Sequence, residues 1–527
     1  RRLTQTLEAM LTFSKYMFNT VQVDALAGIG KYLESYEGYG ISYEDVHDAI
    51  NEHDISSAKG KFYPTSHTRK NEKRSQFFKA SFDILDKYVL TATLRRDGTD
   101  KFFPGNKYAL FPSVSGAWKI SNENFLKNIS WINLLKLRAS WGKTGQDNLG
   151  SSLYGSYAPN NFKVNFSDNG IINIPYVSMG ANYPDVSWQK TTMKNIGLDF
   201  YLLSDRISGS FDFFRNDITR LLGYASTSPL AIYETRPING GHYYRRGWEL
   251  MVDTKNLVGE FTWDTSLTFS KTNSFWKERL PNYDYQIYQQ RENEPMSAYY
   301  YYNVTGIINT DRSNMPESQK TLQAEAQLPG CPIIEDKNKD GKIDENDVYM
   351  KDNSPAIYVG IGNTFTYKRF EFSFFMYGQF GIQKYNIAYS AAQAGPLAVD
   401  YPENSNKFAY RLWNSQTNPN GSRPGLAIGK MGALPGNAWV NADRENASFM
   451  RMRNITLAYN LAGNILGSLQ RYVRNIKVYV DAQNPFILTK FQGFDPEIYT
   501  GGGGASGGSR GEHPQTRTFS LGANITF

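Results

Sequence analysis

The sequence predicts an all-β fold, and within that class an antiparallel β-barrel that spans a membrane. Apolar and polar residues alternate along many segments of the 527-residue chain. Each alternating segment is about ten residues long, close to the ~9–11 residues of a tilted membrane strand. Short turns and long connections also follow one another along the chain, as in outer-membrane barrels.

The composition agrees with strands and turns and excludes a helical membrane protein. Aromatic residues make up 15% of the chain and glycine occurs 45 times, which suits strands, tight turns and interfacial aromatic belts. No segment approaches the ~20 consecutive apolar residues that a membrane helix needs. Alternating strands have unremarkable average hydropathy, so a hydrophobic content of 40% is compatible with a membrane barrel.

Charge and cysteine content exclude several other classes. The formal net charge is +7, but lysine and arginine are spread along the chain, without a basic stripe that carries interleaved aromatic residues. Nucleic acid is therefore not an expected partner. The single cysteine, Cys331, excludes an internal disulfide framework and a four-cysteine metal site.

The clearest alternation lies at the end of the chain. In residues 518–527, apolar side chains lie on one face of the predicted strand and polar or small side chains on the other. The apolar face consists of Phe519, Leu521, Ala523, Ile525 and Phe527. Residues 135–141, 261–269 and 476–482 repeat the pattern. A sandwich with one wet face and a membrane barrel both explain it, and the segment length favours the barrel.

The connections favour the barrel more strongly. Residues 204–205, 256–260 and 368–369 each join two strands by a short turn. Long segments separate these pairs: about thirty residues before 247–254, then 271–355, 380–447 and 485–516. Outer-membrane barrels have short periplasmic turns and long extracellular loops, whereas a sandwich has no reason to keep this order. We count about fifteen strands, an odd number that predicts a larger barrel with further strands.

The segment 336–347, DKNKDGKIDEND, resembles the ion loop of an EF-hand and lies in the long connection 271–355, which we expect to be extracellular. The predicted ligands occupy loop positions 1, 3, 5, 7, 9 and 12: Asp336, Asn338, Asp340, the carbonyl of Lys342, Asp344 and Asp347. Gly341 occupies the sharp turn at position 6 and Ile343 the apolar anchor at position 8. We predict a Ca²⁺ site, with Mg²⁺ as the alternative ion.

The flanks of this loop predict its role. No helical pattern precedes or follows it, so a helix-moving sensor is not expected, and we interpret the loop as a staple that orders the long connection. Ion-triggered gating and an ion-free acidic turn are the alternatives; an ion-free turn does not account for Gly341 together with Ile343.

No catalytic residues are predicted. The chain has no HExxH motif, nucleophile elbow or cysteine–histidine pair. Its strand carboxylates are expected on a wet inner face, and we predict that the protein is not an enzyme; these residues are Asp199, Asp212, Glu249, Asp253, Asp264 and Asp481. Aromatic residues in 298–303 and Trp413 suit both sugar stacking and an interfacial girdle, so no substrate-binding residue is assigned.

Several blocks together resemble the SusC/RagA family, the TonB-dependent outer-membrane importers of Bacteroidetes. They occur in the family's order over residues 80–527; the blocks are 88–102, 110–121, 135–145, 186–200, 336–347, 449–461 and 481–497. Any one block is weak evidence, whereas the ordered set is specific.

The resemblance implies a barrel of about 22 strands in the cell outer membrane, with an N-terminal plug inside it. It also implies a SusD-like surface lipoprotein as partner, a dimer of such SusCD pairs, and energy from TonB–ExbB–ExbD. The implied cargo is an oligosaccharide or an oligopeptide. Signal peptide, TonB box, plug and first strands are expected outside this chain, which would be the C-terminal part of the barrel (1–527). The alternative is a non-transporting surface barrel, an adhesin or a structural porin, with an ion-stabilised loop.

Overall fold

The structure is a computed structural model of the chain, and it describes most of residues 1–527. The segments outside the described residues are 44–61, 150–152, 154–156, 166–170, 179–181, 228–234, 282, 284, 290–291, 387–410, 426–430, 433, 443, 463–466, 468–470, 494 and 498–514. The described residues contain strands and short 3₁₀ turns and no α-helix. Accordingly, none of their helices could cross a membrane.

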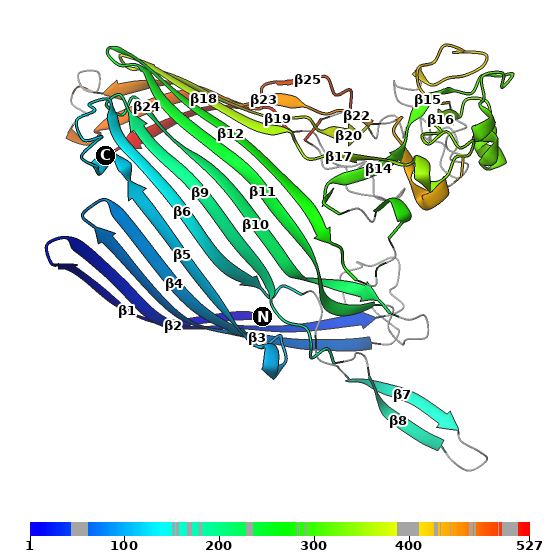
Figure 1. Cartoon of the computed structure of the whole chain (residues 1–527), viewed down its shortest axis with the longest axis horizontal. Coiled ribbons are helices and arrows are strands. Elements are labelled where there is room, and N and C mark those ends of the chain that lie inside the picture. The colour runs from blue at the N-terminus through cyan, green and yellow to red at the C-terminus, as the bar shows by residue number, and fades with distance from the viewer. Residues whose placement is uncertain are drawn as a thin grey trace.

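One large antiparallel sheet dominates the described residues (Figure 1). It has 17 strands, of which two are short, β13 (Glu294–Pro295) and β25 (Ile487–Thr489), which leaves 17 − 2 = 15 long strands. The first eight long strands are β1 (Arg2–Met17), β2 (Val21–Tyr43), β3 (Phe62–Ile84), β4 (Tyr88–Thr99), β5 (Tyr108–Lys119), β6 (Ile132–Gln146), β9 (Gln189–Leu202) and β10 (Ile207–Ser226). The other seven are β11 (Thr235–Leu257), β12 (Phe261–Glu278), β18 (Ile357–Tyr367), β19 (Phe370–Phe380), β23 (Phe449–Ala462), β24 (Asn475–Gln483) and β26 (Thr518–Thr526).

Each long strand pairs with the next long strand of the chain, so the sheet is a meander. It curves without closing in the described residues, because β1 pairs only with β2 and β26 only with β24 (Figure 1). The predicted all-β class, the antiparallel order and the count of about fifteen strands are confirmed. A closed barrel of about 22 strands stays a prediction.

The two ends of the sheet differ. At one end, which we call the turn end, tight turns join consecutive strands, as at 18–20, 85–87 and 203–206. Residues in these turns have positive φ, for example Asn19 (52°) and Asp86 (54°), as in the hairpin turns that match strand twist. The opposite end, the loop end, carries the longest connections of the chain.

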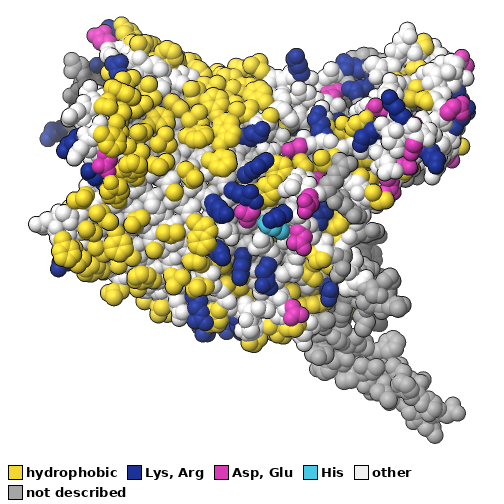
Figure 2. Space-filling view, viewed as in Figure 1, with side chains coloured by type: hydrophobic (Ala, Val, Ile, Leu, Met, Phe, Trp, Pro, Cys, Tyr) yellow, Lys and Arg dark blue, Asp and Glu magenta, His cyan; other side chains and the backbone are white. Residues whose placement is uncertain are grey.

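The two faces of the sheet also differ, as the alternation predicts. Ile196, Phe211 and Phe213 are exposed on one face of β9 and β10, and on β26 Leu521 retains 79% of its surface. Figure 2 shows such hydrophobic side chains as a broad band over the strands. The opposite face is polar and carries the ion pairs described below. We call the apolar face the outer face and the polar face the inner face.

Strand lengths differ from the sequence prediction. About thirty residues were expected between the strand after 204–205 and the strand at 247–254, but β10 continues to Ser226 and β11 already begins at Thr235. The register is continuous from Ile207 opposite Thr254 to Thr219 opposite His242. Beyond the apolar band these strands mix apolar residues such as Ile218 and Leu222 with polar ones, so period two disappears from the sequence while backbone pairing continues.

The connections 279–356 and 381–448 fold together at the loop end, and we call the described parts of both the loop module. It contains β14 (Ala298–Tyr302), β15 (Val304–Ile307), β16 (Pro332–Ile334), β17 (Tyr349–Asp352), β20 (Gln383–Tyr385), β21 (Trp439–Val440) and β22 (Arg444–Asn446). Tyr302, Ile308 and Cys331 are fully buried in its core, with Leu434 from the second connection beside them. A separate hairpin, β7 (Tyr157–Asn165) and β8 (Ile171–Ser178), follows β6.

Candidate functional sites: the inner face, the ion loop and a loop-end pocket

The inner face holds the predicted carboxylates as ion pairs and hydrogen bonds. Arg138 on β6 contacts Asp199 on β9 at 2.7 Å and Asp212 on β10 at 3.0 Å. The register explains this contact, because Arg138 lies opposite Gly197 and Gly197 lies opposite Asp212. A side chain at 197 would occupy the space of the Arg138 guanidinium, since a Cβ there would lie 2.7 Å from its Nη2.

The same polar face continues around the sheet. Lys477 on β24 contacts Glu371 on β19 at 2.9 Å, and Asp481 accepts a hydrogen bond from Thr456 at 2.7 Å. A hollow of about 370 Å³ includes Asp253, Asp264 and residues from four further strands in its lining. This polar, charged surface suits passage of a polar solute.

The ion loop 336–347 joins β16 to β17 within the loop module and is stabilised by its own side chains. Asp336 accepts hydrogen bonds from the amides of Asp340 and Gly341, at 3.2 and 2.8 Å. Asp340 accepts one from Lys342 at 2.9 Å. Gly341 has a φ of 85°, the left-handed conformation predicted for the sharp turn at position 6.

The end of the loop is anchored more deeply. Asp347 is fully buried and accepts hydrogen bonds from the amides of Lys337 (2.8 Å) and Asp344 (2.9 Å). Asp344 in turn caps the 3₁₀ turn Glu345–Asp347 by accepting from Asn346. Ile343 is 4% exposed and packs in the core of the loop module, as predicted for position 8.

The ion-ligand role of the six predicted residues stays a prediction. Within the described part of the chain, no group of three or more His, Cys, Asp or Glu side chains is placed to hold a metal ion. The predicted ligand set also includes Asn338 and the carbonyl of Lys342, and each carboxylate has about four acceptor positions, of which the amides use only part. The donor chemistry therefore fits a hard cation.

The tyrosines of 298–303 have a structural role that sequence reasoning missed. The Tyr302 hydroxyl lies between the carbonyl oxygens of Asp344 (2.9 Å) and Pro435 (3.0 Å) and shares its one proton between them, so it ties the ion loop to the second connection. Burial raises the pKa of Tyr302 and keeps it protonated as a donor. Tyr299 stacks under Arg444, whose guanidinium carbon lies 3.8 Å from the ring centroid.

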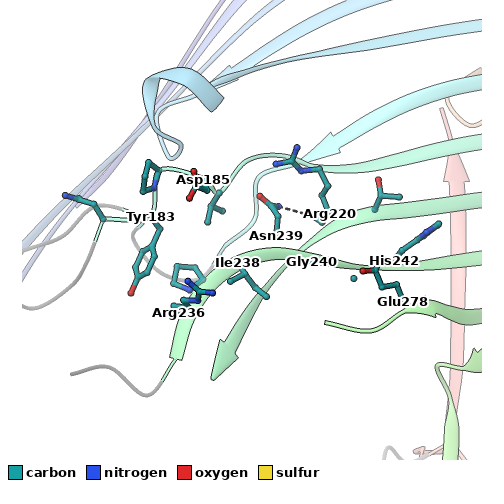
Figure 3. A pocket seen from close by; sticks show the side chains of 15 residues that line it. Tyr183, Asp185, Arg220, Arg236, Ile238, Asn239, Gly240, His242 and Glu278 are labelled. Carbon is teal, nitrogen blue, oxygen red and sulfur yellow. Dashed lines mark hydrogen bonds between the residues drawn. The ribbon is translucent and has the colours of Figure 1, made fainter. Parts of the chain in front are cut away.

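A pocket of about 700 Å³ lies at the loop end of β10 and β11 (Figure 3). Tyr183 and Arg236 lie toward one end of it and His242 and Glu278 toward the other, with Asn239 between them. The Asn239 amide fixes the wall, since it donates to the carbonyls of Ser187 and Arg220 at 2.9 Å each.

A local break in strand pairing shapes this pocket. Thr219 lies opposite His242 and Leu221 opposite Gly240, so Arg220 and Gly241 are left out of the pairing without a change of register, and both have positive φ. The lining of the pocket contains two guanidinium groups and two carboxylates. Sequence reasoning did not identify it, because a break in pairing between two strands leaves no recognisable motif in either one.

Comparison with known proteins identifies the family. Residues 3–484 match the family described as TonB dependent receptor-like, beta-barrel. The chain belongs to this family. Members are outer-membrane proteins, so the apolar outer face of the sheet faces lipid, as predicted. The relatives are receptors and transporters and not enzymes, which agrees with the absence of a predicted catalytic site.

Individual relatives agree with the resemblance to SusC/RagA. TonB-dependent receptor P3 of Formosa agariphila is 27% identical over 549 residues, which cover 100% of this chain and 53% of that protein. TonB-dependent receptor SusC of Bacteroides thetaiotaomicron is 29% identical over 475 residues, which cover 88% of this chain and 44% of SusC. The chain thus spans about half the length of these curated relatives.

Solved structures show the same fold. The structure of the RagAB peptide transporter superposes on this chain with a TM-score of 0.79 at 20% identity. The match covers 100% of this chain and 55% of the transporter chain. The RagAB peptide importer in its 'closed-closed' state gives a TM-score of 0.79 at 18% identity. This match covers 100% of this chain and 56% of the importer chain. At this level of identity the likeness concerns the fold alone.

Proposed function

We propose that the protein imports oligosaccharides or oligopeptides across the outer membrane, and that this chain supplies much of the wall of its barrel. The observation that carries the proposal is the polar inner face of a lipid-facing sheet, with Arg138, Lys477 and their carboxylate partners turned toward the interior. A solute that crosses such a barrel meets fixed charges and hydroxyl groups instead of hydrocarbon.

The proposal includes a partner and an energy source. SusC is named a TonB-dependent receptor, and RagAB is described as a peptide transporter. By analogy, we infer that a SusD-like surface lipoprotein covers the loop end and that TonB–ExbB–ExbD supplies the energy through residues outside this chain. The loop module offers a folded surface at that end for such a lipoprotein, and two pairs can associate as a dimer.

The proposal also includes the ion loop. We infer that Ca²⁺, or Mg²⁺ in its place, binds Asp336, Asn338, Asp340, Asp344 and Asp347 together with the Lys342 carbonyl. Ile343 anchors the loop in the core of the loop module, and Asp347 is fully buried beside it. The ion would hold the two ends of the loop 336–347 together and so order the long connection around it, which is a structural role.

Uptake by whole cells tests the import proposal. The gene is deleted and then restored, and uptake of fluorescent oligosaccharides and oligopeptides is compared with and without a protonophore. We expect uptake of one of the two classes to fall at least tenfold on deletion and on loss of the proton gradient.

Retention of normal uptake of both classes in the deletion strain, combined with loss of surface attachment or of passive permeability, would favour the alternative of an adhesin or a structural porin. Co-purification of a surface lipoprotein with the tagged full-length protein tests the partner separately.

A further inference from the structure

On eight strands, one outward-facing cation follows the apolar stretch. On β9 the outer-face positions from the turn end are Leu202, Phe200, Leu198 and Ile196, and the next one is Lys194. The corresponding residues on the eight strands, which we call the basic collar, are Lys31 (β2), Arg74 (β3), Arg96 (β4), Lys143 (β6), Lys194 (β9), Arg215 (β10), Arg246 (β11) and Lys271 (β12).

The strand register brings five of these cations side by side. Lys194 lies directly opposite Arg215, and Arg215 lies directly opposite Arg246. Lys31 lies opposite Arg74 in the same way. Like charges at directly opposed positions destabilise a sheet, so an uncompensated row of this kind requires counter-charges.

The described residues supply only part of that counter-charge. Asp217 contacts Arg215 at 3.0 Å, and Glu72 lies 3.4 Å from Lys31 and also pairs with Arg74. Lys194 and Arg246 form no ion pair with any residue that the structure describes. The collar therefore carries excess positive charge on the outside of the barrel.

Aromatic rings hold several collar cations at the border of the apolar band. The Arg96 guanidinium lies over Tyr108 (4.3 Å to the ring centroid), and that of Arg215 lies over Tyr244 (4.5 Å). Tyrosine and tryptophan rings are typical of the level where hydrocarbon meets lipid headgroups. The collar thus lies at headgroup depth.

The collar covers one arc of the sheet. Figure 2 shows lysine and arginine side chains gathered beside the hydrophobic band. On β18 the outer-face positions are Tyr367, Phe365, Asn363, Ile361, Val359 and Ile357, which include no cation along the whole described strand. The positive charge is therefore a local feature of β2–β12 and not a general property of this barrel.

We propose that the basic collar binds the phosphate groups of anionic lipid headgroups in the outer leaflet. The cations are adjacent, they lie at headgroup depth, and phosphate is the anion that arginine forks and lysine ammonium groups bind best. The inference rests on the location in the outer membrane and is independent of the proposed import function.

Lipid binding by the purified full-length protein in neutral detergent tests the proposal. The probes are a lipid A that carries two phosphates, the same lipid after dephosphorylation, and inorganic phosphate. The variant combines Lys194→Gln, Arg215→Gln and Arg246→Gln. The control combines Arg206→Gln, Lys255→Gln and Lys368→Gln, which removes equal charge at the turn end.

We expect the phosphorylated lipid to bind the wild-type protein and the control with equal affinity. Because one cation near a charged membrane surface contributes roughly a factor of five, the collar variant should bind roughly 100-fold more weakly. Equal binding of the dephosphorylated lipid, an unchanged affinity of the collar variant, or equal saturation by inorganic phosphate would each overturn the proposal.

A second measurement covers the case in which the collar variant does not fold. Wild-type affinity for the phosphorylated lipid should then fall as salt rises, while that for the dephosphorylated lipid stays constant, because salt screens exposed charges. Salt-independent binding of both lipids contradicts the assignment. The charge-preserving pair Arg215→Lys and Arg246→Lys should retain wild-type salt dependence.

Discussion

Asp336 and Asp340 have one observed and one predicted role in the loop 336–347, and the two can be separated by experiment. Both carboxylates accept hydrogen bonds from loop amides, and both are predicted ion ligands. An ion bound between them would add charge-assisted contacts that hydrogen bonds alone do not supply. The loop should therefore be more stable with bound Ca²⁺ than with its hydrogen bonds alone.

The double variant Asp336→Ala, Asp340→Ala tests this point. We expect limited proteolysis within 330–350 to become at least about tenfold faster, while the barrel keeps its heat resistance, because the core residues Ile343 and Val348 stay in place. Chelation of Ca²⁺ should accelerate cleavage of the wild-type protein by a smaller factor, because the hydrogen bonds remain, and should leave cleavage of the variant unchanged. A wild-type cleavage rate that chelation does not alter contradicts ion binding.

The sequence predicted the turn at Gly341 and the anchor Ile343 but not the contacts of the surrounding tyrosines, for a physical reason. Ligand spacing and Gly341 are local, so the loop geometry follows from adjacent residues. Tyr302 hydrogen-bonds to Asp344 and to Pro435, a residue 133 positions away, and no local pattern contains that pairing. These contacts of Tyr302 could be identified only from the structure.

At the scale of elements, a buried charge cluster holds the connection after β24 against β23. Arg451 on β23 is 3% exposed and makes a two-bond contact with Asp495 at 2.7 and 2.8 Å. Asp495 also accepts from the amide of Gln515 at 3.2 Å, so one carboxylate ties both ends of that connection to the strand. Glu497 is a second partner of Arg451.

Removal of the Arg451 charge should be costly. The variant Arg451→Met leaves Asp495 buried without its partner, so we expect the free energy of unfolding to fall by about 3–5 kcal/mol. The measurement is urea unfolding of the full-length protein in lipid vesicles. Arg453→Met, two residues along the same strand, removes one hydrogen bond to Asn484 and should cost about 1 kcal/mol. An equal fall in the free energy of unfolding for the two variants would contradict a special role of the buried Arg451 charge.

Elements also show where sequence reasoning stops. Period two predicted the membrane part of β12, β24 and β26, because lipid on one face and water on the other impose alternation. It did not predict that β10 and β11 extend beyond the apolar band, where apolar and polar residues no longer alternate. The basic collar was equally hidden: Lys194, Arg215 and Arg246 are scattered in the sequence, and only the register makes them neighbours.

At the scale of the molecule, the fold combines three surfaces with different chemistry. The outer face is apolar and bordered by the basic collar, the inner face is polar and ion-paired, and the loop end carries a separately packed module. Fold class and strand order could be predicted from alternation and turn spacing. The loop module could not, because its core joins residues from two connections on either side of β18 and β19.

The assignment of lipid to one face and water to the other is the central claim, and a nitroxide scan of β10 tests it most directly. In the full-length protein with Cys331→Ser, single cysteines are placed at residues 207–215, labelled, and reconstituted into lipid vesicles. Collision rates with oxygen, which dissolves in lipid, and with a polar nickel complex are then measured.

We expect the two collision rates to oscillate with period two and opposite phase. Oxygen access should peak at Gly209, Phe211 and Phe213, and nickel access at Ser208, Ser210 and Asp212, on the side where Arg138 pairs with Asp212. At Arg215 oxygen access should fall, because the collar leaves the hydrocarbon. Collision rates without period two, or maximal oxygen access at Asp212, would contradict a barrel with a lipid-facing outer and a water-filled inner side.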